Sequence, residues 1–426
     1  MAIGLQPARA GTGPYDGVQD VLTAVLGAVV VVAIHLDGRA HMLNLPDSFF
    51  TPWHGVLYGG VTALSGWLLL LGRVHGRRLG RLLRMPAGYG PALAGAGLFL
   101  LGGGADLLWH TVFGIESGIE ALLSPTHLWL FVAGALMLSG PIRAALARRD
   151  TGAAPSGPGL AAAVVAATSL AGLAGFALSF LSAYLTDAPS QPVPHFPEGT
   201  AEHAAVEIPA SWGLASYLVT SLVLVVPLAY LILRWRLPFG TVTGYASSLA
   251  LLAVTLADFH RLYAVPATAL AGLTVDTFLL AARRRGIGAR TQAVVAAALL
   301  PALAWSGQLV GIATSERLAW PVELVAGVVV LSTLLSALAA GFLAAPTTTP
   351  HPPRRHPELS ASHGQNHPGA PPPHTEATGR AQRTAHIAPR ADDDETAASA
   401  PAAGACRAAK PQARTETRRR GHEVAS

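Results

Sequence analysis

Long apolar runs alternate with short polar connectors over most of the first 344 residues. Runs of about 18 to 25 apolar residues are long enough for an α-helix to cross a hydrocarbon core of roughly 30 Å. The pattern predicts ten such helices, at approximately residues 18–36, 54–72, 90–110, 125–145, 159–185, 212–233, 240–258, 264–282, 291–312 and 320–344. We therefore expect an all-α fold, a polytopic bundle of about ten transmembrane helices in a lipid bilayer.

The composition agrees with a membrane protein and sets the end of the chain apart. Of 426 residues, 51% are hydrophobic and 12% are charged, about half the charge usual in a soluble protein. The last residues, 346–426, are rich in Pro, Ala, Thr, His and Arg and have too little apolar content to form a core. We predict a disordered tail there, after a four-span unit at residues 1–150, built from a duplicated two-helix hairpin, and a six-span unit at residues 151–345.

Basic residues indicate the orientation of the bundle. They follow the second, fourth, sixth and eighth spans: Arg73, Arg77, Arg78, Arg81 and Arg84; Arg143, Arg148 and Arg149; Arg234 and Arg236; and Arg283, Arg284, Arg285 and Arg290. The odd-numbered spans lead into connectors with almost no Arg or Lys, including the long connector at residues 186–212. Because Arg and Lys stay on the cytoplasmic side, we expect both termini to be cytoplasmic in a multi-pass protein of the bacterial plasma membrane.

Two similar sets of acids and histidines lie where odd-numbered spans end and even-numbered spans begin. Both sets have the pattern Asp-x3-His-x5-acid, followed by a hydroxyl residue, Pro, any residue and His. The first set consists of Asp37, His41, Asp47 and His54, and the second of Asp106, His110, Glu116 and His127. In the predicted topology both sets lie on the outer side of the membrane.

The spacing of these residues suits metal coordination. Residues four apart share one face of a helix, so Asp37 and His41 can direct a carboxylate and an imidazole at one point, as can Asp106 and His110. His54 and His127 would supply the third ligand from the next helix. Two imidazoles and one carboxylate form a ligand set for copper, zinc or non-haem iron with coordination positions left open. Asp47 and Glu116 would be further ligands or would orient an imidazole.

The first set resembles a known copper site. Asp37-x3-His41-x12-His54 is similar to the Asp-x3-His-x12-His copper site in the C subunit of particulate methane and ammonia monooxygenases. The second set departs from that pattern, because sixteen rather than twelve residues separate His110 from His127. Ten spans, a duplicated hairpin and the lack of a soluble copper-binding domain are further departures. The resemblance implies copper at Asp37, His41 and His54, and it carries over no substrate.

The rest of the chain narrows the chemistry. Cys406 is the only cysteine and lies in the tail, so disulfides and thiolate metal sites are excluded from the membrane helices. The sequence has no haem, flavin or nucleotide motif, and nothing in it points to nucleic acid. An oxidase would therefore need a redox partner, either another protein or a membrane quinol.

Three functions fit these observations. The first is a membrane-embedded, copper-dependent oxidase or monooxygenase-like enzyme that acts on a small apolar substrate at the outer face. The second is a non-catalytic protein that acquires or transports copper or zinc. The third is a structural subunit in which Asp–His pairs only anchor helix ends.

Overall fold

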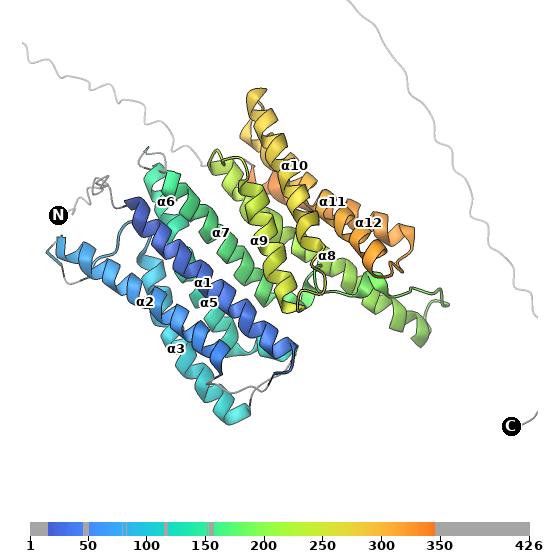
Figure 1. Ribbon diagram of the computed structural model, residues 1–426, viewed down its shortest axis with the longest axis horizontal. Coiled ribbons are helices and arrows are strands. Elements are labelled where there is room, and N and C mark those ends of the chain that lie inside the picture. Colours follow the sequence, from blue (N-terminus) through green and yellow to red (C-terminus); the bar gives the residue numbers. More distant parts are fainter. Residues whose placement is uncertain are drawn as a thin grey trace, which may run out of the picture. The chain divides into compact units, whose positions relative to one another are not determined.

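The computed structural model describes residues 16–45, 51–78, 80–81, 83–114, 118–150, 152 and 157–345, and these are helical, without strands. They belong to one compact unit, Met1–Pro350. The α-helices are α1 Asp16–Met42, α2 Pro52–Arg78, α3 Gly90–Phe113, α4 Ile119–Leu123, α5 Pro125–Leu138, α6 Gly140–Asp150, α7 Gly157–Ala177, α8 Ala201–Arg234, α9 Thr241–Leu256, α10 Ala264–Arg284, α11 Ala289–Ser315 and α12 Val322–Leu343 (Figure 1). The predicted all-α fold is confirmed.

Each predicted span coincides with an apolar helix, but among the described residues fewer than the predicted ten of these helices qualify as membrane spans. Within the described ranges, 8 helices are long and apolar enough to cross a bilayer, and the bent pair α5 and α6 raises this to 9. The span predicted at 240–258 corresponds to α9, an apolar helix of 16 residues. At about 1.5 Å per residue, α9 is roughly 24 Å long, shorter than a hydrocarbon core of about 30 Å. Because the other helices, with the bent pair counted as one, are long and apolar enough to cross the bilayer, the chain is a multi-pass membrane protein.

The span predicted at 125–145 is broken. Helix α5 ends at Leu138 and α6 begins at Gly140, with a bend of 42° between them. Pro141 has no backbone N–H, so the hydrogen-bond ladder of α5 cannot continue through it. An apolar run alone does not reveal this break.

The connector expected between residues 186 and 212 is shorter than predicted. Helix α7 ends at Ala177, and after two 3₁₀ turns α8 already begins at Ala201. The hydroxyl of Thr200 accepts a hydrogen bond of 3.2 Å from the backbone N–H of His203, so a side-chain cap starts the helix eleven residues earlier than hydropathy suggests.

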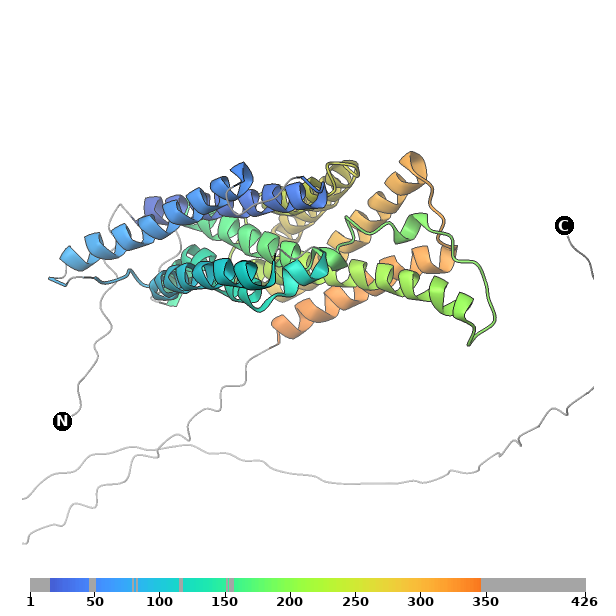
Figure 2. The same ribbon diagram turned by 90° about the horizontal axis from the view of Figure 1, so that it is seen from below.

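Close helix packing places the two acid–histidine sets. Helix α1 packs against α2 and α7, and α3 packs against α5. A Cβ atom at Gly95 would lie 2.7 Å from the carbonyl oxygen of Ala133, so glycine is what permits this approach of α3 to α5. Figures 1 and 2 show α1 beside α2, and the ends of α1 and α3 point the same way.

Two predictions about the organisation of the chain are not tested by the described residues. The tail predicted at 346–426 lies outside the described residues. The division of the remaining chain at residue 150 stays a prediction.

Candidate metal centres

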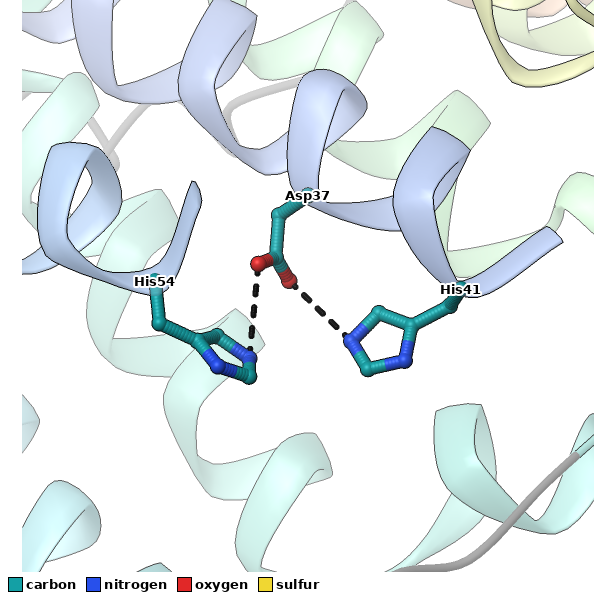
Figure 3. Close-up of side chains that lie close together, drawn as sticks. All are labelled: Asp37, His41 and His54. Atoms are coloured by element: carbon teal, nitrogen blue, oxygen red, sulfur yellow. Dashed lines mark ion pairs between the residues drawn. The ribbon is translucent and has the colours of Figure 1, made fainter. Parts of the chain in front are cut away.

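Asp37, His41 and His54 lie together at the junction of α1 and α2, and we call this group site 1. Oδ2 of Asp37 is 3.5 Å from Nε2 of His41, one turn further along α1. Oδ1 of Asp37 is 3.3 Å from Nε2 of His54, in the first turn of α2. Figure 3 shows the carboxylate between the two rings, with one oxygen directed at each. The three side chains offer ligand atoms that all lie within 4.8 Å of one another.

Asp106, His110 and His127 form a second group, site 2, at the junction of α3 and α5. Oδ2 of Asp106 is 3.4 Å from Nε2 of His110, and Oδ1 is 3.6 Å from Nε2 of His127. The imidazole rings are 5.7 Å apart with an interplanar angle of 55°, against 5.5 Å and 57° for His41 and His54 in site 1. The two sites therefore share one geometry although their connectors differ in length.

Local sequence explains how each final histidine is positioned. Pro52 and Pro125 occupy the first position of α2 and α5, where a missing N–H costs nothing. The hydroxyl residue before each proline contacts the histidine three residues later. Oγ1 of Thr51 is 2.9 Å from Nδ1 of His54, and Oγ of Ser124 is 2.8 Å from Nδ1 of His127.

In site 2 the partner of His110 determines its tautomer. Nδ1 of His110 is 3.2 Å from the carbonyl oxygen of Gly114, and a carbonyl only accepts, so Nδ1 carries the hydrogen. In the neutral ring Nε2 then presents a lone pair to the carboxylate of Asp106. A histidine that donates one N–H to a carbonyl and directs the other nitrogen at a carboxylate oxygen has the arrangement common among metal ligands.

The separations between ligand atoms suit a shared ion better than direct hydrogen bonds. The four Nε2-to-oxygen distances run from 3.3 to 3.6 Å, beyond the usual 2.7–3.2 Å of an N–H···O bond. Ligands held about 2.0–2.1 Å from a tetrahedral ion are separated by roughly 3.3–3.4 Å. In both sites the separations between the carboxylate oxygens and the imidazole nitrogens are therefore those of ligands that could share one ion.

Burial of the carboxylates adds an energetic argument. Asp37 and Asp106 are each only 8% exposed, and an acid buried in a membrane protein is costly unless it is paired. Oδ1 of Asp37 is fully buried and accepts no hydrogen bond from the described residues. A cation at site 1 would supply the missing partner.

The surroundings of the two sites differ in two respects. Oγ1 of Thr126 donates a hydrogen bond of 2.7 Å to Oδ1 of Asp106, whereas Trp53 occupies the corresponding position in site 1. Tyr58 stacks on His54 with ring centres 5.8 Å apart, and Phe131 stands at the equivalent place after His127. Sequence reasoning missed Thr126, although aligning the two motifs places it next to His127.

A charged contact next to site 1 joins α1 to the turn between α9 and α10. Arg39, between Asp37 and His41 on α1, donates hydrogen bonds to Asp258 in the turn between α9 and α10. Asp258 and Phe259 both have positive φ values, 52° and 60°, which favour glycine and are uncommon for other residues. The ion pair with Arg39 joins this turn to the end of α1.

The six predicted ligands are thus brought together as two separate groups of three. That the groups bind metal stays a prediction. Asp47 and Glu116, predicted as further ligands or orienting residues, lie outside the described residues. No family model, curated protein or solved structure matches this chain.

Proposed function

We propose that this chain is a membrane-embedded copper protein with two mononuclear sites at the outer face, and that it oxidises a small apolar substrate. The observation that carries the proposal is the arrangement of one buried carboxylate between two imidazoles, repeated at both sites with separations of 3.3 to 3.6 Å. The chain is a multi-pass helical protein with residue groups able to hold metal. The metal, the reaction and the orientation are our inferences.

Copper is the metal that the ligands favour. Two neutral imidazoles with one carboxylate bind copper, zinc and iron, and divalent copper generally binds such sites most tightly of the three. The resemblance of site 1 to the copper site of the monooxygenase C subunit points the same way. If the purified protein held zinc or iron instead, copper would be the wrong metal, but the assignment of the ligands would stand.

The ligand sets leave coordination positions open for chemistry. Bound copper would accept electrons from a quinol or a protein donor and activate dioxygen. In a monooxygenase reaction one oxygen atom enters a C–H bond and the other leaves as water, with two electrons and two protons taken from the donor. Thr51, Ser124 and the carbonyl of Gly114 would keep the ligating rings oriented, and the apolar helices would keep bulk water from the carboxylates.

Metal acquisition is the second candidate, and one observation favours it. The side chain of His41 is 40% exposed. None of the six predicted ligands lines the cavity that includes His35 or the cavity that includes Asp276 and Arg283. An accessible ligand suits a protein that accepts copper and passes it on. Substrate-dependent oxygen consumption by the copper-loaded protein would favour the enzyme, and copper transfer without oxygen consumption would favour acquisition.

Metal content is the experiment that tests the common core of the proposal. We expect the detergent-purified protein to hold about two copper ions per chain, with a paramagnetic resonance signal that shows nitrogen ligation. His41→Ala and His110→Ala should each remove one ion, and the double variant should remove both. Circular dichroism and size-exclusion profiles should stay unchanged.

His203→Ala is the matched control. Nε2 of His203 lies 2.9 Å from Glu207 four residues later, so this is an acid–histidine pair of the same helical spacing without a third ligand. Its loss should leave the metal content unchanged. Unaltered metal content in both His41→Ala and His110→Ala would contradict the proposal. Lower stability in those variants, from a protein that never held metal, would instead indicate that the pairs only anchor helices.

A further inference from the structure

A small cavity lies among α1, α7, α8, α9 and the segment that joins α7 to α8. Its volume is about 30 Å³, and its walls are mostly leucine, valine, alanine and glycine side chains. His35 on α1 is among the lining residues. His35 and Asp37 are two residues apart and so point to different sides of α1, which places this cavity away from the ligands of site 1.

The imidazole of His35 has an unused hydrogen-bond acceptor. The residue is 2% exposed, and its Nδ1 lies 2.8 Å from the carbonyl oxygen of Val31. Since a carbonyl only accepts, Nδ1 is the donor, and Nε2 of the neutral ring carries a lone pair. Phe176 packs edge-on to the ring at 5.3 Å and offers Nε2 no hydrogen bond. Among the described residues no group donates to Nε2.

The other polar groups of the lining are mostly satisfied within the protein. Oγ1 of Thr220 donates to the carbonyl of Ser216 at 2.7 Å and accepts from the backbone N–H of Ala183 at 2.8 Å. The hydroxyl of Tyr184 is 3.3 Å from that of Thr268. No acid, lysine or arginine lines the cavity, so nothing there would balance a charged ligand.

We propose that this cavity binds a small neutral molecule with an apolar body and one hydroxyl or N–H group, which donates to Nε2 of His35. One water-sized ligand needs about 10–15 Å³ of such volume, so 30 Å³ holds roughly two or three linked groups of that size. A short-chain alcohol has this size and this polarity. The apolar walls favour its carbon atoms, and the buried nitrogen favours its hydroxyl.

This site is independent of the proposed metal chemistry, because none of the six predicted metal ligands lines the cavity. Copper content and ligand binding at His35 can therefore succeed or fail separately.

Two probes of equal size and shape test the role of the donor group. Ethanol and dimethyl ether are isomers with three non-hydrogen atoms each, but only ethanol donates a hydrogen bond. The full-length protein, labelled with ¹⁵N-histidine in detergent, would be titrated with each probe while the Nε2 resonance of His35 is followed. That resonance is identified by its loss in His35→Phe. We expect a saturable shift with ethanol and at least about fivefold weaker binding of dimethyl ether, the ratio that one net hydrogen bond supplies.

Gly175→Ala provides a variant that keeps His35 and should fold. A Cβ atom at this lining residue would meet only the side chain of Val223, at 3.9 Å, so the added methyl group takes up cavity space without a clash. We expect ethanol to bind Gly175→Ala at least about threefold more weakly, with the copper content unchanged. Equal binding of the two probes, a shift that does not saturate, or undiminished binding in Gly175→Ala would overturn the proposal and leave water as the occupant.

Discussion

Thr126 donates a hydrogen bond of 2.7 Å from its hydroxyl to Oδ1 of Asp106, and the equivalent oxygen of Asp37 has no such donor. The two sites differ in this hydrogen bond because of the residue two positions after Thr51 or Ser124. That residue is Thr126 in site 2 and Trp53 in site 1. Two sites with the same ligand types therefore hold their carboxylates differently. Among the described residues, the contact of Oδ1 of Asp37 is with Nε2 of His54 at 3.3 Å, so site 1 lacks the hydrogen bond that orients the carboxylate of site 2.

Removal of the Thr126 hydroxyl should weaken site 2 alone. Thr126→Val keeps the shape of the side chain but frees Oδ1 of Asp106, and loss of such a supporting hydrogen bond typically costs about 10- to 100-fold in metal affinity. We expect about a tenfold loss, measured by competition with a chelator in an Asp37→Ala background so that only site 2 reports. Trp53→Phe in the same background should change nothing. A loss in that control as large as in Thr126→Val would show that the hydroxyl has no specific role.

Ser124 should matter both to the fold of α5 and to site 2. Its Oγ accepts from the backbone N–H of His127 at 3.3 Å and contacts Nδ1 of the same ring at 2.8 Å. Ser124→Ala should lower the free energy of unfolding by about 1 kcal/mol through the lost cap, and should lower the copper affinity of site 2 by about tenfold through the lost ring partner. Thermal unfolding and chelator competition measure the two effects. Ser124→Thr retains a hydroxyl and should recover most of both.

Asp276 should be important for stability and irrelevant to metal. This buried residue on α10 accepts hydrogen bonds from the backbone N–H groups of Val242 and Thr243, at 3.2 and 3.0 Å, and from the hydroxyl of Thr243 at 2.8 Å. It therefore caps the start of α9 from a neighbouring helix. Asp276→Ala leaves buried donors without partners and should cost roughly 2 to 4 kcal/mol. A lower melting temperature with unchanged copper content is expected, and Asp276→Asn should be milder because it keeps one acceptor oxygen.

The ion pair between Arg261 and Glu316 should give the protein an acid-dependent component of stability. Burial by itself raises the pKa of the Glu316 carboxyl, but hydrogen bonds from Arg261, Tyr263 and Ser190 and the positive charge of Arg261 together outweigh burial and lower this pKa below its ordinary value. Oε1 of Glu316 accepts from Nε of Arg261 at 3.1 Å and from the hydroxyl of Tyr263 at 2.6 Å. Because the folded-state pKa is the lower one, the stabilisation is present above the unfolded-state pKa of about 4.3 and is lost as the pH falls through the folded value.

Arg261→Gln tests this component. The variant removes the guanidinium that lowers the pKa of Glu316, so its melting temperature should be lower at neutral pH and should depend less on pH in the acidic range. Melting temperatures of both proteins between about pH 3 and pH 7 measure the difference. Parallel curves over the whole range would mean that the pair contributes no pH-dependent stability.

The order of residues along the chain is enough to predict the helical membrane architecture and the part of each candidate site that lies on one helix. A run of about 20 apolar residues must satisfy its backbone internally in lipid, so the helices follow from length and composition. Likewise Asp37 with His41, and Asp106 with His110, share a helix face because a spacing of four is a property of the helix itself. These features depend on neighbours in the chain, and a linear pattern is enough to predict them.

The contacts between groups on different helices could not be predicted from the residue order. The approach of His54 to Asp37, the bond from Thr126 to Asp106, the cap that Asp276 places on α9 and the open nitrogen of His35 all depend on how far apart packed helices lie and how they are rotated. Helix packing is set by side-chain shape and by glycines that permit close contact, and in lipid it has no strong apolar pattern to reveal it, because lipid-facing and buried residues are equally hydrophobic. Helix packing also decides whether the two acid–histidine sets form one site or two. They form two separate groups, which the spacing of the motifs could not predict.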